Sequence, residues 1–142
     1  MLSAVFPAFS SVFPVPSNND IAAKLLHFGT DDCNRLLVLR SVGYSVELCP
    51  TVEEFHPALQ KRPDADAVLV RAASERESRQ VVRLAREHSN APLVLFNTYY
   101  DYADEDQFEL VISPLTPPEE WLRQIAGLIK QKSILHEPQS NQ

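Results

Sequence analysis

Glycine is scarce in this chain. Only three glycines, Gly29, Gly43 and Gly127, occur among 142 residues. They lie too far apart to form a phosphate-binding loop, a G-x-G-x-x-G dinucleotide motif or a nucleophile elbow, because each of these motifs places its glycines within a few residues. The sequence therefore lacks the common nucleotide-binding and hydrolase motifs, and we expect neither enzyme activity nor a cofactor.

Cysteine is equally sparse. The two cysteines, Cys33 and Cys49, match neither a zinc site nor a C-x-x-C redox pair. The four histidines, at positions 27, 56, 88 and 136, are scattered and are not spaced as metal ligands. We therefore expect two reduced thiols in a cytoplasmic protein without a metal, and we expect His27 to be a hydrogen-bonded residue of the core.

Positive charge is in deficit. Thirteen Lys and Arg residues stand against 19 Asp and Glu residues, which gives a formal net charge of −6. General affinity for nucleic acid or for an anionic membrane requires a cationic surface, so we expect neither partner.

A membrane-spanning run is also missing. Residues 1–20 are apolar, but they contain no basic residue and are interrupted by three prolines, so they resemble neither a secretory leader nor a span. We predict an extended N-terminal arm whose phenylalanines, Phe6, Phe9 and Phe13, pack on the domain or on a neighbouring subunit.

The sequence does contain the pattern of one domain in which strands and helices alternate. Apolar residues make up 44% of the chain, which is enough for a core. From residue 21 to residue 132, short apolar runs alternate with segments of helical period, as is typical of parallel βαβ units. The predicted strands are 24–28, 45–49, 66–70, 91–97 and 108–113. Residues 133–142 form a polar tail.

Helix start signals separate these strands. Asp31 or Asp32 can cap the first helix. Thr51 and Ser74 begin capping boxes for the next two, and Thr116 begins a third ahead of the last helix, with Pro117 at its first position. The predicted inner face of the first helix comprises Leu36, Leu37, Leu39 and Val42.

Two further features modify this helical pattern. Pro57 should kink or shorten the second helix, because proline lacks the donor for the i−4 bond. The segment between the fourth and fifth strands, residues 98–107, shows no apolar helical face, so we predict a loop or a single turn there.

The order of these elements resembles the receiver domain of bacterial response regulators. The resemblance is carried by "VGY" before the second strand, "RPDADAVLV" at the third, "APLVLF" at the fourth, and Ser113 with Pro114 after the fifth. It implies a flavodoxin-like (CheY-like) three-layer α/β sandwich. The parallel sheet would have the order 2-1-3-4-5, with a fourth helix that is shortened or absent and a site at the C-terminal strand ends.

The resemblance also implies a degenerate phosphoacceptor pocket. A working receiver has an acidic pair after the first strand, an aspartate ending the third, a hydroxyl after the fourth and a lysine after the fifth. Arg71, Asn97 and Ser113 stand at the last three of these positions. Asp31 and Asp32 are candidates for the acidic pair but fall two residues late. Because arginine offers no lone pair and keeps its proton, phosphorylation of the usual kind is excluded.

Two roles for Arg71 remain open. Its guanidinium could lie between Asp31 and Asp32 and supply the positive charge that magnesium provides elsewhere. Alternatively, it points into water, as most arginines do. We slightly favour pairing, because the fold places this residue at the C-terminal strand ends, where the acidic pair is expected.

Two charged segments are candidate surfaces. Arginines 76, 79, 83 and 86 share one helix face, which could bind an acidic partner or phosphates but is more simply a solvated face. The acidic segment 101–109 is accompanied by Tyr99, Tyr100 and Tyr102. With Trp121 these form a candidate interaction surface. An acidic loop that only aids solubility and a core position for Trp121 are the alternatives.

We therefore predict a stand-alone, phosphorylation-independent receiver-like signalling module. It would act through a protein partner of a signalling pathway, with a homodimer as one possibility. The alternative is a small flavodoxin-like enzyme or ligand-binding domain that uses the cleft at the C-terminal strand ends. That hypothesis lacks both a nucleophile with its base and a glycine-rich phosphate cradle.

Overall fold

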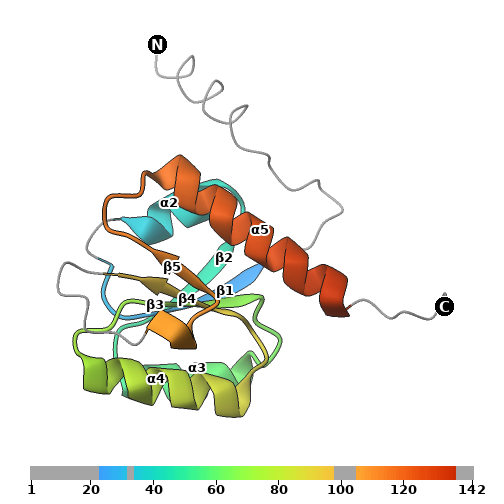
Figure 1. Cartoon of the computed structure of the whole chain (residues 1–142). Helices are drawn as coiled ribbons and strands as arrows, with labels where there is room; N and C mark the ends of the chain where they lie inside the picture. Colours follow the sequence, from blue (N-terminus) through green and yellow to red (C-terminus); the bar gives the residue numbers. More distant parts are fainter. Residues whose placement is uncertain (1–22, 32–33, 98–104, 137–142) are drawn as a thin grey trace.

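The chain folds around one parallel sheet. The computed structural model describes residues 23–31, 34–97 and 105–136 (Figure 1). The strands are β1 (Lys24–Phe28), β2 (Ser45–Cys49), β3 (Ala67–Val70), β4 (Leu93–Phe96) and β5 (Leu110–Ile112). They pair in the order β2-β1-β3-β4-β5, and every pair is parallel. The predicted order 2-1-3-4-5 is confirmed.

Helices cover both faces of this sheet. Helices α2 (Arg35–Ser41) and α5 (Pro118–His136) lie on one face, and α3 (Val52–Lys61) and α4 (Glu75–His88) lie on the other (Figure 1). Each interface has its own core. Leu26, Phe28 and Phe55 belong to the α3/α4 side, whereas Leu25 and Phe96 belong to the α2/α5 side. This three-layer arrangement is the predicted flavodoxin-like architecture.

The connection from β4 to β5 departs from a regular βαβ unit. In its described residues, 97 and 105–109, the only helical turn is the 3-10 turn η1 (Glu105–Gln107). Residues 98–104 lie outside the described residues. The four α-helices of the described chain fit the prediction that the fourth helix of the receiver pattern is shortened or absent.

Two predicted capping boxes are confirmed. The Thr51 hydroxyl accepts a hydrogen bond from the Glu54 backbone N–H at 3.3 Å, and the Ser74 hydroxyl accepts one from the Glu77 N–H at 3.1 Å. The prediction for Pro57 is wrong in part, since α3 continues past it to Lys61. Pro57 is on the exposed face of α3. The carbonyl that loses its partner there can be hydrated, which keeps the cost of the missing bond low.

The last helix begins later and ends later than predicted. It starts at Pro118, so Thr116 is not its cap; the Thr116 hydroxyl instead shares a hydrogen bond with the Ser113 hydroxyl at 3.0 Å. The helix continues to His136, beyond the boundary predicted at residue 132.

The predicted inner face of the first helix is correct except at Leu37. Leu36, Leu39 and Val42 are buried, whereas Leu37 is 69% exposed. The helix begins at Arg35 and has only seven residues, preceded by Asn34 in a left-handed conformation (φ 58°). Successive residues of a helix point about 100° apart, so a helix this short buries a single stripe, and Leu37 lies outside it.

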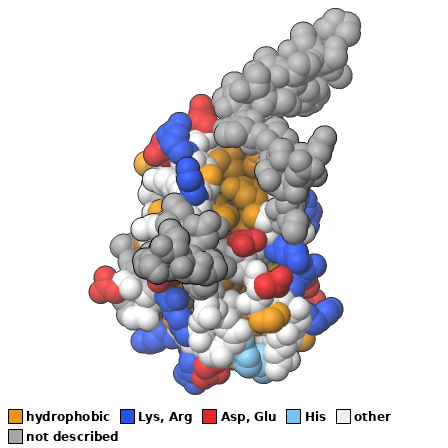
Figure 2. Space-filling model, turned by 90° about the vertical axis from the view of Figure 1, so that its right-hand side faces the viewer, with side chains coloured by type: hydrophobic (Ala, Val, Ile, Leu, Met, Phe, Trp, Pro, Cys, Tyr) orange, Lys and Arg blue, Asp and Glu red, His pale blue; other side chains and the backbone are white. Residues whose placement is uncertain are grey.

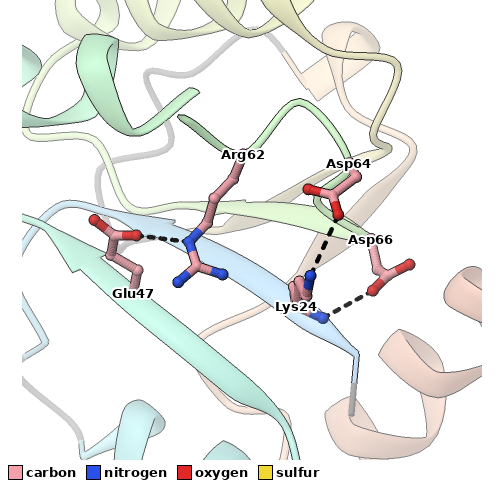
Figure 3. Close-up of polar contacts among 5 residues, drawn as sticks. All are labelled: Lys24, Glu47, Arg62, Asp64 and Asp66. Atoms are coloured by element: carbon pink, nitrogen blue, oxygen red, sulfur yellow. Dashed lines mark hydrogen bonds and ion pairs between the residues drawn. The ribbon is translucent and has the colours of Figure 1, made fainter. Parts of the chain in front are cut away.

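Polar side chains tie together the N-terminal strand ends (Figure 3). The Lys24 backbone N–H donates to the Asp66 carboxylate at 2.8 Å, and the Lys24 ammonium lies 3.3 Å from Asp64. The Arg62 guanidinium donates to Glu47 at 2.9 Å. These contacts join β1, β2 and the segment entering β3, so this edge of the sheet is occupied by structural ion pairs.

Apolar side chains gather on the side toward which α5 extends. Figure 2, which views the molecule from that side, shows an apolar patch with charged side chains on part of its rim. We expect the phenylalanines of the N-terminal arm to pack on the domain or on a neighbouring subunit. Residues 1–20 lie outside the described residues, so that expectation stays a prediction. Among the described residues, no helix is both long and apolar enough to cross a bilayer.

Candidate functional site

The residues that follow the strands meet at the C-terminal edge of the sheet. Backbone hydrogen bonds extend the sheet by one residue beyond the strands. The Arg71 N–H donates to the Phe28 carbonyl, and the Asn97 N–H donates to the Ile112 carbonyl, both at 2.9 Å. Arg71 therefore stands at the centre of the edge, where β3 lies between β1 and β4.

Gly29 and Arg71 are packed backbone to backbone. Gly29 has φ +99°, and its N–H donates to the Cys49 carbonyl at 2.9 Å. A Cβ atom placed on Gly29 would overlap the carbonyl oxygen of Arg71. Only glycine fits this position, because it alone combines the left-handed backbone with the close approach. The chain leaving β1 thus lies directly against the chain leaving β3.

The Arg71 side chain is half-buried, and its Nη1 donates to the Thr30 hydroxyl at 3.2 Å. The Asp31 carboxylate is bonded instead to the start of α2. It accepts the backbone N–H groups of Arg35 at 2.7 Å and of Leu36 at 3.1 Å. Asp31 is thus engaged at the start of α2, and the contacts among the described residues include no Arg71–Asp31 ion pair; the position of Arg71 between Asp31 and Asp32 stays a prediction. Asp32 lies outside the described residues.

The remaining strand-end positions carry uncharged groups. Asn97 is half-buried, and Ser113 is exposed. Besides sharing a hydrogen bond with the Thr116 hydroxyl, Ser113 accepts the Thr116 backbone N–H at 3.1 Å, which closes a turn before α5. Ser113 therefore acts as a turn residue at the position where the receiver pattern has an ammonium group.

An arginine that the sequence did not single out lies beneath this edge. The Arg35 guanidinium carbon is 4.3 Å from the centre of the Phe96 ring, close enough for a cation–π interaction. The Phe96 ring also contacts Trp121, whose ring centre lies 5.4 Å from that of Phe96 in an edge-on geometry. Trp121 is only 6% exposed, so its proposed place on an interaction surface is wrong and the alternative core position is correct.

His27 lies in the same buried layer. Its ring stacks against Phe96 at 6.3 Å and is fully buried, and neither ring nitrogen has a hydrogen-bond partner among the described residues. The expected hydrogen bond is therefore wrong, although the core position is right. Burial, together with the charge of Arg35 and against the opposing effect of the Asp31 carboxylate and nearby backbone, lowers the pKa of His27 to about 4. His27 is neutral at physiological pH.

The thiol of Cys49 is buried and free. Burial, with the carboxylates of Glu47 and Glu54 nearby, raises the pKa of this thiol to about 11. It is therefore protonated and unreactive. In the part of the chain that the structure describes, no three His, Cys, Asp or Glu residues gather as a metal site. Cys33, Tyr99, Tyr100 and Tyr102 lie outside that part.

Gly29, Thr30 and Arg35 are the site residues that the sequence left without a role. A glycine directly after a buried strand is a usable signal for a close backbone approach. The orientation of Arg35 over Phe96 has no such signal, because the two residues meet only through the packing of α2 on β4.

The fold is that of a response-regulator receiver domain. A receiver protein from Sinorhizobium medicae WSM419 is similar with a TM-score of 0.61 and 15% identity, over 77% of this chain and 95% of that chain. A response regulator from Thermotoga maritima is similar with a TM-score of 0.58 and 15% identity, over 78% of this chain and 99% of that chain.

A third solved structure, described as adenylate cyclase from Rhodopirellula baltica, is similar with a TM-score of 0.67 and 18% identity. The match covers 81% of this chain and 93% of that chain. No protein-family model and no curated protein matches the sequence. At these identities the likenesses establish the fold, and the function has to be argued from the residues at the strand ends.

Proposed function

We propose that this chain is an atypical receiver-like signalling module that works without phosphorylation and acts through protein–protein contact. The observation that carries the proposal is the position of Arg71. It follows β3 directly, its backbone is bonded to the end of β1, and its guanidinium donates to the Thr30 hydroxyl. The centre of the strand-end edge therefore holds a permanent cation.

A cation at this point cannot accept a phosphoryl group. The guanidinium has no lone pair to attack phosphorus and stays protonated at physiological pH. It also repels a divalent metal ion, which phosphoryl transfer needs to neutralise charge. Ser113, whose hydroxyl is paired with Thr116, offers no ammonium group to hold a new phosphate. Three requirements of the phosphorylation reaction are thus unmet by the residues described here.

The alternative of a small enzyme at the same edge finds less support. Nucleophilic catalysis requires a hydroxyl or thiol beside a base. Of the hydroxyls that the structure describes at this edge, Thr30 accepts a bond from Arg71 and Ser113 pairs with Thr116, and neither partner is a base. The Cys49 thiol is buried with a raised pKa. A binding module fits these residues better than a catalyst.

Intact-mass spectrometry after incubation with acetyl phosphate and Mg²⁺ tests the proposal. An aspartate-containing receiver treated in parallel is the positive control. We expect the control to gain one phosphoryl group and this protein to keep its mass. A phosphoryl adduct on the folded wild-type chain, lost on mild hydrolysis as an acyl phosphate would be, contradicts the proposal.

A further inference from the structure

Helix α4 carries a stripe of exposed arginines on its outer surface. Arg76, Arg79 and Arg83, which we call the arginine stripe, are all exposed. Together with Gln80 they line a surface hollow of about 560 Å³. Their spacing of three and four residues places them on one helix face. The stripe lies on the α3/α4 side of the sheet, on the opposite face from α5 (Figure 1).

The guanidinium groups of the arginine stripe form few hydrogen bonds or ion pairs within the described structure. Arg79 lies 3.8 Å from the Glu75 carboxylate, too far for a strong hydrogen bond. Arg76 and Arg83 have no hydrogen bond or ion pair with any described residue. Arg86, one turn further along, differs: it donates to the Gln107 carbonyl and to the Glu109 carboxylate, both at 2.9 Å. Arg86 therefore links α4 to the segment before β5, whereas the arginine stripe exposes its hydrogen-bond donors to solvent.

An anionic partner suits this surface, and the surrounding charge selects its class. The chain as a whole carries −6, and the exposed carboxylates of Glu75 and Glu87 flank the stripe on the same helix. A nucleic acid presents a long, continuous run of phosphates that would meet these acids and the negative field of the domain. A short acidic segment of a protein can contact the arginine stripe without extending over the acidic residues around it.

The geometry of the stripe also fits carboxylates. Along a helix, residues three and four apart rise about 4.5 and 6 Å, so the three arginines follow one another at the spacing of side chains along a neighbouring helix. Each guanidinium can donate two parallel hydrogen bonds to one carboxylate.

We propose that the arginine stripe is the docking surface for an acidic segment of a partner protein. The inference rests on the proposed function, since it names the surface and the partner chemistry of a module that acts by protein contact. The two remain separable. The phosphorylation assay reports on the residues at the strand ends, and a failure of the docking surface leaves its outcome unchanged.

Fluorescence anisotropy with a labelled decaglutamate peptide at low ionic strength tests the docking surface. The full chain is compared with the double variant Arg76→Gln/Arg83→Gln. The matched control is Arg123→Gln on α5, another exposed arginine, which pairs only with Glu120 among the described residues. Loss of two exposed charge pairs should weaken binding by about tenfold, whereas the control should stay within about twofold of wild type. Added salt should weaken wild-type binding.

Four results would overturn the proposal. The first is no measurable peptide binding by the wild-type chain, and the second is an equal loss in the Arg123→Gln control. The third is tighter binding of a single-stranded RNA of ten nucleotides than of the peptide. The fourth is peptide binding that appears only after Asp101, Asp104 and Asp106 are changed to Asn, since the chain's own acidic segment would then be the occupant. Circular dichroism of each variant confirms that it is folded.

Discussion

The carbonyl of Arg71 lies against the Cα of Gly29, in the space that a side chain at Gly29 would need. This contact fixes the distance between the chain leaving β1 and the chain leaving β3. It also anchors the backbone of the one residue that, at the centre of the site, carries a permanent positive charge. The arrangement depends on glycine at position 29 as much as on arginine at position 71.

Gly29→Ala should therefore destabilise the protein strongly. The new methyl group would meet backbone, which cannot move aside as a flexible side chain can, and φ +99° strains any L-residue. We expect a loss of about 3 kcal/mol in the free energy of unfolding, measured by urea denaturation.

Gly127→Ala is the matched control for this substitution. Nothing lies within 4 Å of a Cβ built at Gly127, which is inside α5. Because alanine favours a helix over glycine, this variant should gain up to about 1 kcal/mol. Similar losses from both substitutions would show that Gly29 is not packed against Arg71.

His27 should make stability depend on pH. Its folded pKa of about 4 lies below the ordinary value of 6.5, so in between these values the unfolded chain binds a proton that the folded chain does not. Stability is fully present above pH 6.5 and is lost as the pH falls toward 4, by roughly 3 kcal/mol from this residue.

His27→Leu isolates this effect. The unfolding free energies of wild type and variant are measured by urea denaturation from pH 7 to pH 4. Over this range the wild type should lose more free energy of unfolding than the variant, by the amount attributed to His27. His88→Gln, a histidine at the end of α4, is the control and should retain the wild-type loss. If the His27→Leu and wild-type curves are parallel, His27 is not a buried neutral histidine.

Glu109 should be more important for stability than its exposure suggests. Its carboxylate accepts the backbone N–H of buried Leu93 at 2.7 Å and pairs with Arg86 at 2.9 Å. Glu109→Ala leaves that N–H without its partner, which should cost about 2 kcal/mol. Glu120→Ala removes a carboxylate that pairs with exposed Arg123 and should cost under about 0.5 kcal/mol. Equal thermal shifts for the two variants would contradict this.

Arg71→Asp should not restore phosphorylation by itself. The variant gains a carboxylate at the centre of the edge, but position 113 still lacks an ammonium group, and Gly29 and Thr30 supply no carboxylates for a metal ion. Acetyl phosphate with Mg²⁺ should leave the intact mass of the folded variant unchanged. Robust labelling would show that the requirements assigned to these strand ends are wrong.

The sequence predicted the elements whose signals are local. The bounds of β1 and β2 and the capping boxes at Thr51 and Ser74 agree with the structure. Each depends on residues within one turn or one strand. The strand order followed from the resemblance, and the structure confirms it.

The errors have two sources: nearby groups that compete for one side chain, and contacts that form only when the layers of the fold pack together. Thr116 carries a capping signal, but its hydroxyl pairs with Ser113. Asp31 is a candidate both for capping the first helix and for pairing with Arg71. In the structure its carboxylate accepts two backbone N–H groups of α2. The Arg35 cation over Phe96 and the contact of Gly29 with Arg71 arise only when the layers assemble. A glycine after a buried strand indicates the second of these contacts, but no spacing in the sequence encodes the first.

The most direct test of the central claim is the response of backbone amides to beryllofluoride and Mg²⁺, which together mimic an acyl phosphate. In a ¹⁵N-labelled sample, the amides of Gly29, Arg71 and Asn97 report on the three strand ends. If Arg71 makes the edge unable to accept a phosphoryl group, their chemical shifts stay unchanged at saturating reagent. Saturable shifts at these amides that require both reagents would contradict the account.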